Sequence, residues 1–265
     1  MNQHLSRAAL VLILTLALVY GVGSATPAKK TLRVMTYNIH VGVGMDKKLD
    51  LQRIADVINR EQPDLVGLQE VDRGVKRTEG KDEIAELAAM TKMHFDFAPN
   101  LDYQGGKYGV AILSRFPIHS SMHIMFENKR EAERRGMLMV EVDVGDTTVH
   151  FVTTHLDYQF EDGRLFETQQ LMGNLEDVKG PLIVVADLND TPNGSAYKLM
   201  RSVFQDAWVV SKAKGDGFSY PADKPVKRID HIFYRTSKGA RAKKAWVVET
   251  LASDHVPVVA TIEIN

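Results

Sequence analysis

The chain of 265 residues contains no cysteine. Disulfide bonds, thiolate nucleophiles, zinc sites with cysteine ligands and a lipid on an N-terminal cysteine are therefore excluded. Any metal that this protein binds has to be held by oxygen atoms or imidazole nitrogens.

The chain also has little net charge, because 33 Lys and Arg residues balance 34 Asp and Glu residues to a formal charge of −1. Proteins dedicated to duplex DNA usually present a clearly basic face, so this balance argues against that class without excluding it. Hydrophobic residues make up 44% of the sequence and charged residues 25%. That composition is typical of a folded protein with a sizeable core.

Only one long apolar run is present, over residues 8–22. Arg7 precedes it and the small residues 23–25 follow it, as in a secretory signal peptide. The run is short for a membrane span, which needs about 20 apolar residues. We therefore predict a signal peptide over residues 1–25, with an N-terminal membrane anchor as the alternative. A linker is expected over residues 26–30 and one folded domain over residues 31–265.

Short β-branched runs alternate with amphipathic stretches along the expected domain. Helices are expected at residues 51–58, 84–88 and 165–175, with a short one starting near Ser195. Asp50 and Asp82 precede the first two as N-cap residues. Strands are expected at residues 108–113, 118–125, 137–144 and 245–250, besides six described next. This pattern predicts an α/β (α+β) protein with two packed β-sheets and helices outside.

Six further apolar runs carry a polar side chain at one end. The polar residues at these ends are Asn38, Glu70, His155, Asp187, Asn189, Asp230, Asp254 and His255. In neighbouring antiparallel strands the end of one strand and the start of the next share a rim, so these side chains can converge on one opening. A cluster of carboxylates, amides and imidazoles suggests metal-assisted hydrolysis of a phosphoester.

Glu70 is the first candidate metal ligand, because a carboxylate is a hard oxygen donor, and Asn38 can hold a metal-bound water or a phosphate oxygen. Taken singly, a Glu after a strand is usually just solvated and an Asn there usually caps a turn. Asp187 and Asn189 point to the same side at period two, so one can orient water while the other grips phosphate. An Asx-rich turn over residues 187–194 is an equally good interpretation of that segment.

Asp254 and His255 stand side by side before the last strand, and both reach one site only if the backbone turns there. Asp230 is expected to accept a hydrogen bond from His255 and to raise its basicity. His155 is suited to protonating a leaving oxygen, although a lone His after a strand is more often structural. The other histidines show no carboxylate partner in the sequence and are treated as background. They are His40, His94, His119, His123, His150 and His231.

Seven motifs stand in the order found in the endonuclease/exonuclease/phosphatase superfamily. They are RVMTYN at residues 33–38, DLVGLQE at 64–70, YGVAILSR at 108–115, TTHL at 153–156, VADLN at 185–189, IDHI at 229–232 and SDHVPV at 253–258. The chain resembles this superfamily over nearly all of residues 31–265. The resemblance implies a four-layered αββα sandwich of two mostly antiparallel β-sheets with Mg²⁺, or Mn²⁺, at the rim.

The resemblance also assigns roles to residues. The implied residues at the metal are Asn38, Glu70 and Asp254, with Glu70 as the principal ligand. The implied catalytic residues are His155, Asp187, Asn189, Asp230 and His255. The sequence departs from the commonest pattern at Ala186, Leu188 and Val110, and the last departure puts a substrate contact in doubt.

Residues 70–77 and 105–108 are similar to small exported bacterial members related to the catalytic domain of GPI-anchor lipid-remodelling proteins. Arg73 and Arg77 follow the expected metal ligand closely, so they and Tyr108 are candidates to bind substrate through an anionic head group. An exposed basic turn is the structural alternative.

We therefore expect an Mg-dependent phosphoric ester hydrolase, a phosphodiesterase or phosphatase, acting on a phospholipid head group or another small phosphorylated molecule. A secreted Mg-dependent endonuclease or exonuclease acting on DNA or RNA is the alternative. A non-catalytic binding module is disfavoured because every expected polar position is filled. A serine hydrolase is disfavoured because no Gly-x-Ser-x-Gly motif is present.

Two N-glycosylation acceptors begin at Asn189 and Asn193, and a glycan on Asn189 would fill the expected site. A bacterial periplasmic or extracellular location is therefore expected, in preference to a eukaryotic secretory route. We also expect a monomer that makes transient contact with a membrane surface.

Overall fold

The computed structural model describes residues 30–235 and 241–264. The expected signal peptide over residues 1–25 and residues 26–29 of the expected linker lie outside the described residues. Lys30, the last residue of that linker, is instead the first residue of strand β1 (Lys30–Asn38). No helix in the described part of the chain is long and apolar enough to cross a bilayer.

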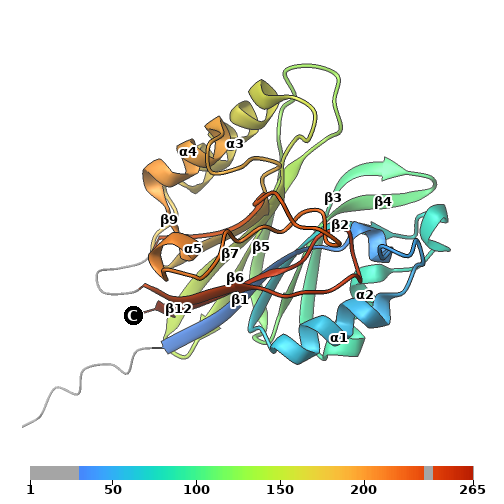
Figure 1. Cartoon of the computed structure of the whole chain (residues 1–265), viewed down its shortest axis with the longest axis horizontal. Helices are drawn as coiled ribbons and strands as arrows, with labels where there is room; N and C mark the ends of the chain where they lie inside the picture. Colours follow the sequence, from blue (N-terminus) through green and yellow to red (C-terminus); the bar gives the residue numbers. More distant parts are fainter. Residues whose placement is uncertain (1–29, 236–240, 265) are drawn as a thin grey trace, which may run out of the picture.

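Two six-stranded sheets pack face to face (Figure 1). The first sheet has the order β11 (Ala242–Val247), β12 (Val258–Ile264), β1, β2 (Leu65–Arg73), β4 (Gly106–Ser114) and β3 (His94–Tyr103). The second has the order β5 (Ile118–Met125), β6 (Gly136–Val144), β7 (Thr147–His155), β8 (Leu182–Asp187), β10 (Asp230–Arg235) and β9 (Gln205–Asp206). Both sheets are mostly antiparallel, as predicted.

Helices cover the outer face of each sheet. They are α1 (Leu51–Glu61) and α2 (Glu83–Thr91) on the first sheet, and α3 (Glu161–Leu175) and α4 (Ser195–Val203) on the second. The short α5 (Ala207–Val210) instead packs against the core between the sheets. Two 3₁₀ turns are η1 (His40–Gly42) and η2 (Lys76–Thr78). Asp50 and Asp82 cap α1 and α2 by accepting hydrogen bonds from backbone N–H groups of the first turn. The four predicted helices are therefore confirmed.

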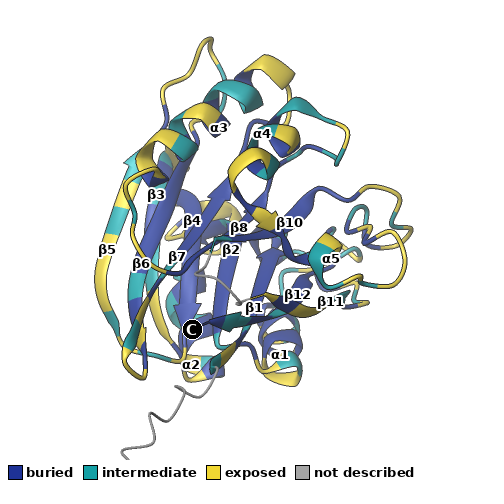
Figure 2. Ribbon diagram, turned by 90° about the vertical axis from the view of Figure 1, so that its left-hand side faces the viewer, coloured by how far each residue is buried: buried dark blue, intermediate teal, exposed yellow. Residues whose placement is uncertain are grey.

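The buried side chains form three layers of core. One lies between the sheets and includes Val140 and Ile183, and a second lies under α1 and α2 and includes Ile54. The third lies under α3 and α4 and includes Leu171. Figure 2 shows the central strands of both sheets as buried, whereas the edge strand β5 and the outer faces of the helices are largely exposed. This arrangement is the four-layered αββα sandwich that the resemblance implied.

Two differences from the sequence-based expectation lie at the edges of the first sheet. Strand β3 was not predicted, and the strand expected at residues 245–250 lies at Ala242–Val247. An edge strand pairs on one side only, so it tolerates charged residues and proline and lacks a clear apolar pattern. Pro99 in β3 sits beside a register shift, and Lys243 and Lys244 of β11 are exposed.

The strand register brings polar ends to one rim. β1 and β2 run parallel, and so do β7 and β8, so both pairs end at the same side. His155 lies opposite Asp187, and Asp187 lies opposite Asp230 at the start of the antiparallel β10. Three polar residues from separate segments therefore stand in one row across the second sheet.

The two sheets are in close contact where β2 crosses β7 and β8. A Cβ on Gly67 would lie 2.2 Å from Val185 Cγ2 and 2.8 Å from Thr153 Oγ1. Next to this crossing, Gln69 Nε2 donates to Thr153 Oγ1 at 2.9 Å and links the sheets. Because Glu70 follows directly, this contact sets the distance between the polar rims of the two sheets.

We predict that Gly67→Ala lowers the free energy of unfolding by about 1–3 kcal/mol, because an added methyl group has no space between the sheets. Urea-induced unfolding followed by circular dichroism measures this difference.

Gly173→Ala is the matched control, since a Cβ at this position in α3 would meet no atom within 4 Å. There the same substitution is expected to be neutral or to stabilise by up to about 1 kcal/mol. Parental stability of Gly67→Ala would show that the sheets are not in close contact at this point.

Candidate active site

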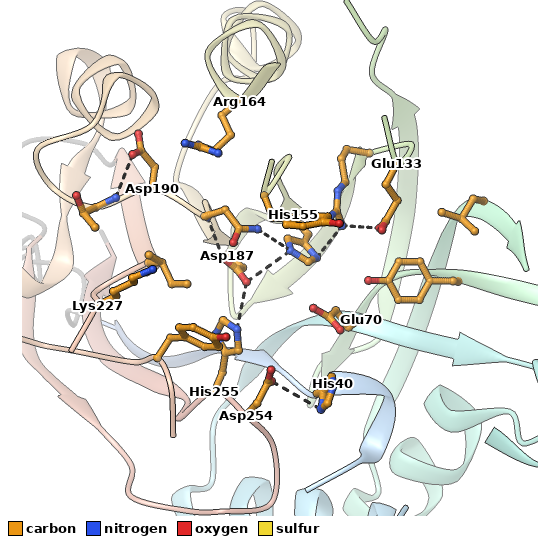
Figure 3. A pocket seen from close by; sticks show the side chains of 18 of the residues that line it. His40, Glu70, Glu133, His155, Arg164, Asp187, Asp190, Lys227, Asp254 and His255 are labelled. Carbon is orange, nitrogen blue, oxygen red and sulfur yellow. Dashed lines mark hydrogen bonds and ion pairs between the residues drawn. The ribbon is translucent and has the colours of Figure 1, made fainter. Parts of the chain in front are cut away.

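A cavity of about 850 Å³ opens at the rim shared by the two sheets (Figure 3). Its wall includes Glu70 from β2, His155 from β7, Asp187 from β8, and Asp254 and His255 from the loop before β12. Segments that are far apart in the chain thus meet at one opening, as the polar strand ends suggested.

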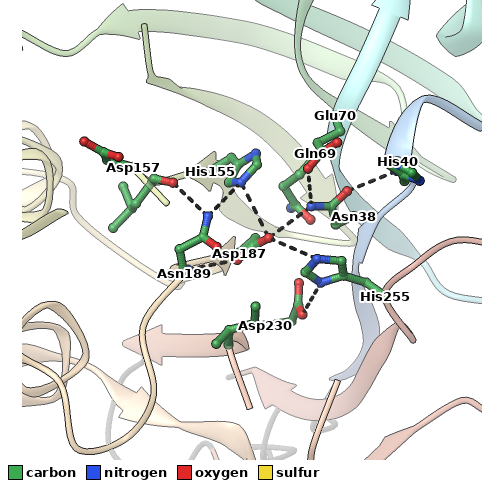
Figure 4. Close-up of polar contacts among 12 residues, drawn as sticks. Asn38, His40, Gln69, Glu70, His155, Asp157, Asp187, Asn189, Asp230 and His255 are labelled. Carbon is green, nitrogen blue, oxygen red and sulfur yellow. Dashed lines mark hydrogen bonds and ion pairs between the residues drawn. The ribbon is translucent and has the colours of Figure 1, made fainter. Parts of the chain in front are cut away.

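The Asp187 carboxylate lies at the centre of this group and is 1% exposed. Its Oδ2 accepts a hydrogen bond from Asn38 Nδ2 at 3.0 Å and lies 3.5 Å from His155 Nε2 (Figure 4). His255 Nε2 lies 3.7 Å from the same oxygen. The other oxygen, Oδ1, accepts from the Asn189 backbone N–H at 2.9 Å. Donor groups from four directions therefore hold this carboxylate in place.

His255 and Asp230 form a buried pair beside Asp187. His255 Nδ1 lies 2.8 Å from Asp230 Oδ2, so Asp230 accepts the Nδ1 proton and Nε2 faces Asp187. Burial by itself would lower the pKa of His255, but the two carboxylates outweigh it and raise that pKa. Burial, together with the nearby Asp230, raises the pKa of Asp187. The expected hydrogen bond is present, while the catalytic role of the pair stays a prediction.

His155 is held from its other side by Arg135, which precedes β6 and is 2% exposed. Arg135 Nη1 lies 2.9 Å from His155 Nδ1. A guanidinium can only donate, so Nδ1 accepts and a neutral ring carries its proton on Nε2. Burial, and then the charge of Arg135, lower the pKa of His155 well below its usual value. Protonation of a leaving oxygen by His155 would therefore use the Nε2 proton of a neutral ring.

Two of the predicted site residues have a strained backbone. The φ angles of Glu70 and Asn189 are 56° and 50°, in the left-handed region that favours glycine. Glu70 lies at a register irregularity of β2 against β4, between Leu68 and Val71. Such conformations cost about 1–3 kcal/mol each and concentrate at functional sites. Asn189 Nδ2 donates to the Leu156 carbonyl at 3.0 Å and lies 3.0 Å from His155 Nε2. With the ring proton on Nε2 both of these nitrogens are donors, so the second contact is not a hydrogen bond.

Asn38, fully buried at the end of β1, links two carboxylates. Its Nδ2 donates to Glu70 Oε1 at 2.9 Å and to Asp187 Oδ2 at 3.0 Å. Its Oδ1 accepts from the His40 backbone N–H at 3.0 Å. Asn38 is therefore placed to orient the Glu70 side chain relative to Asp187. The Asn38 side-chain oxygen is occupied by the backbone N–H of His40.

The donors on the cavity wall fit a divalent cation. Glu70 and Asp254 offer carboxylate oxygens there, which suit Mg²⁺ or Mn²⁺. A second group consists of Asp187, Asp230 and His255, whose ligand atoms lie within 4.8 Å of one another. Because Asp230 already accepts a hydrogen bond from His255, we assign that group to proton transfer. Glu70 and Asp254 remain the candidate ligands.

Of the three residues predicted to bind substrate, two line the cavity. Arg77 makes a bidentate pair with the buried Asp72, at 2.7 and 2.9 Å, and its guanidinium carbon lies 5.1 Å from the centre of the Tyr108 ring. Arg73 does not line this cavity. It forms an ion pair with Asp82 at 2.8 Å and borders a separate hollow. The structure thus separates Arg73 from Arg77 and Tyr108.

The cavity wall also contains residues that the sequence analysis did not single out as functional. They include His40, Glu133, Arg135, Arg164, Tyr220 and Lys227. His40 was treated as background, yet its Nδ1 lies 3.9 Å from Asp254 Oδ1. The Tyr220 ring lies 4.8 Å from the His255 ring. Sequence reasoning could have found His40, because it lies two residues after the predicted site residue Asn38. It could not have found Arg135, because the pairing of β6 with β7 brings Arg135 to the cavity.

Residues 35–255 match the model of the Endonuclease/Exonuclease/phosphatase family. The chain is 26% identical to the uncharacterized protein YbhP of Escherichia coli over 253 residues, which cover 88% of this chain and 97% of the relative. A conserved protein of unknown function from Enterococcus faecalis has a similar structure, with a TM-score of 0.74 and 19% identity over 87% of this chain and 99% of that one. A mannosyl-6-phosphatase from Bacteroides thetaiotaomicron gives a TM-score of 0.71 and 18% identity, covering 87% and 99% of the two chains.

We predict that Asn38→Ala weakens Mn²⁺ binding by about tenfold or more, because Glu70 loses the donor that orients it. Electron paramagnetic resonance of free Mn²⁺ measures this affinity. The control is Asn59→Ala on α1, where the side chain donates to the Met90 carbonyl on the surface. Equal Mn²⁺ affinity in the two variants would contradict the positioning role of Asn38.

Proposed function

Because the chain belongs to the endonuclease/exonuclease/phosphatase family, whose members are hydrolases acting on phosphoesters, we propose that it is a divalent-metal-dependent phosphodiesterase or phosphatase. We propose a phospholipid head group or another small phosphorylated molecule as its substrate. The observation that supports this most strongly is the buried cluster around Asp187, with a half-buried Glu70 beside it.

Asp187 is suited to act as the general base. Its carboxylate has a raised pKa and faces the cavity, so it can accept a proton from an attacking water. His255 has a raised pKa and stays charged at neutral pH, so it donates a proton or a hydrogen bond rather than accepting one. Asp230 holds that charged ring in place through the 2.8 Å contact. In the proposed mechanism the Asp187 carboxylate is therefore the base, and the His255 imidazolium stabilises charge on the phosphate.

Glu70 and Asp254 are the residues that would hold Mg²⁺ or Mn²⁺. A bound cation of this kind polarises a phosphate oxygen and offsets the charge that develops in the transition state. His155, with its proton on Nε2, is oriented by Arg135 to donate to the leaving oxygen from the side opposite His255.

A small substrate agrees with the shape and composition of the cavity. Its volume of about 850 Å³ lies within the range of small-molecule sites, roughly 300–1,000 Å³. Arg77 and Tyr108 on its wall suit a polar head group. The formal net charge of −1 does not favour nucleic acid. One protein of similar fold is named a mannosyl-6-phosphatase, which is a precedent for a small phosphorylated substrate on this fold.

We also propose that the protein is exported to the periplasm or the medium of a bacterium. Arg7, the apolar run over residues 8–22 and the small residues 23–25 support this proposal, because a signal peptide has these three parts in this order. Mass spectrometry of protein recovered from the periplasm is expected to show an N-terminus close to residue 26, and a retained Met1 would contradict cleavage.

We predict that Glu70→Gln and His255→Ala each lower the rate of phosphoester hydrolysis by about 10²-fold or more. The first removes a ligand charge and the second removes the imidazolium beside Asp187. Bis(p-nitrophenyl) phosphate and p-nitrophenyl phosphate, assayed with Mg²⁺ or Mn²⁺, provide the measurement. A chelator is expected to abolish hydrolysis by the parent chain, and added metal to restore it.

His94→Ala on the exposed start of β3 is the control, because His94 does not line the cavity. Near-parental hydrolysis by either Glu70→Gln or His255→Ala would refute the assigned roles. The same preparation is then tested on phospholipids, sugar phosphates and plasmid DNA. Plasmid cleavage that falls steeply with salt, without release of small head groups, would favour the nuclease alternative.

A further inference from the structure

Arg164 projects into the cavity from the first turn of α3 without an acidic partner. Its Nη1 donates to the Asp157 carbonyl at 3.1 Å, and its Nε is buried without a hydrogen-bond partner. Among the described residues it forms no ion pair, although the buried Glu167 is near enough to feel its charge. Its guanidinium charge therefore has no ion-pair partner in the described part of the chain, and a guanidinium on a cavity wall can bind the oxygens of an anion.

Lys227 reaches the same cavity from the loop before β10, and it too has no ion pair in the described part of the chain. Its backbone is held tightly, because its N–H donates to the Tyr220 carbonyl at 2.9 Å and its carbonyl accepts from Tyr220 and Ser219. The Tyr220 ring in turn packs against His255. This loop therefore holds the backbone of Lys227 beside the catalytic residues, and its exposed side chain extends to the cavity wall.

The two cations lie at one end of the cavity. Figure 3 shows Arg164 and Lys227 on the Asp190 side of Asp187, whereas Glu70 lies on the other side. Among the described residues Asp190 forms no ion pair with either cation, and its buried carboxylate accepts backbone hydrogen bonds from Thr191 and from the first turn of α4.

The cations at the opposite end are already neutralised. Arg77 is paired with Asp72, and Arg135 lies 2.9 Å from Glu133. The cavity therefore has an excess of positive charge only beyond Asp187, away from the candidate metal ligands. The fork of a guanidinium and an ammonium group on the same side of the cavity suit the oxygens of a phosphate group.

We propose that Arg164 and Lys227 form a second anion subsite, which binds a phosphate group of the substrate other than the one that is hydrolysed. The favoured substrate is then a small molecule or lipid head group that carries two phosphate groups. This inference rests on the proposed function for the position of the scissile phosphate, but binding at the subsite does not require turnover.

The test compares two non-hydrolysable ligands, propane-1,3-bisphosphonate and propylphosphonate, by isothermal titration calorimetry in Mg²⁺. The parent chain is expected to bind the bisphosphonate about tenfold more tightly, since a charge-assisted contact is worth about that factor. In Lys227→Gln and Arg164→Gln this preference is expected to fall to about threefold or less, while the affinity for propylphosphonate changes by less than about twofold.

Lys224→Gln is the matched control, because Lys224 is an exposed lysine of the same loop that does not line the cavity. It is expected to keep the parental preference. Arg164→Gln removes a contact to the Asp157 carbonyl and can disturb α3, whereas Lys227 is bonded only through its backbone. Lys227→Gln therefore keeps the test decisive.

A lipid source is distinguished by a second arm of the experiment. Phosphatidylcholine vesicles doped with phosphatidylinositol 4-phosphate are compared with vesicles doped with phosphatidylinositol. If the parent prefers the phosphorylated lipid and Lys227→Gln loses this preference, the ligand is a lipid head group. If Lys227→Gln loses only the preference for the soluble bisphosphonate, the ligand is a free metabolite.

The subsite is refuted if neither arm shows a preference in the parent, or if Lys227→Gln retains it. Failure of the proposed function would instead appear as a parent chain that binds these ligands but hydrolyses no phosphoester.

Discussion

The hydrogen bond from Asn38 Nδ2 to the buried Asp187 carboxylate joins the first sheet to the second, and the site is arranged around it. A carboxylate that is 1% exposed is costly to bury unless donors replace its lost water. Asn38 and the Asn189 backbone provide such donors, and His255 adds positive charge nearby. The incomplete compensation leaves the pKa of Asp187 raised, which is what a general base near neutral pH requires.

The fold makes this interaction possible through strand direction and close packing. The parallel pairs β1/β2 and β7/β8 send their carboxyl ends to one rim, while β10 starts there in the opposite direction. Gly67 lets the sheets approach, and Gln69 ties them together one residue before Glu70. A shift of one residue in any of these pairings would turn a site residue to the other face of its sheet. The left-handed backbone of Glu70 and Asn189 is tolerated because this surrounding structure holds it.

The charges around the rim divide the cavity into parts with different tasks. Acidic groups and imidazoles occupy its centre, where a divalent cation and proton transfer are expected. Arg77 and Arg135 are neutralised by acidic partners and serve to position neighbouring groups. Arg164 and Lys227 retain their charge for a ligand. In the proposed function the chemistry and the substrate preference of this chain therefore depend on different residues of one cavity.

The sequence by itself determined the four longer helices, most strands and the chemical character of the rim, because apolar periodicity, N-caps such as Asp50 and polar strand ends are local patterns. It also placed Glu70, Asp187, Asp230 and His255 in one site. Only the tertiary structure decided which cations face the cavity, bringing Arg135, Arg164 and Lys227 to it and leaving Arg73 outside. The tertiary structure alone also revealed the edge strand β3 and the strained bulge at Glu70. The physical reason is that these features depend on contacts between strands and loops far apart in the chain, and no local sequence pattern records such contacts.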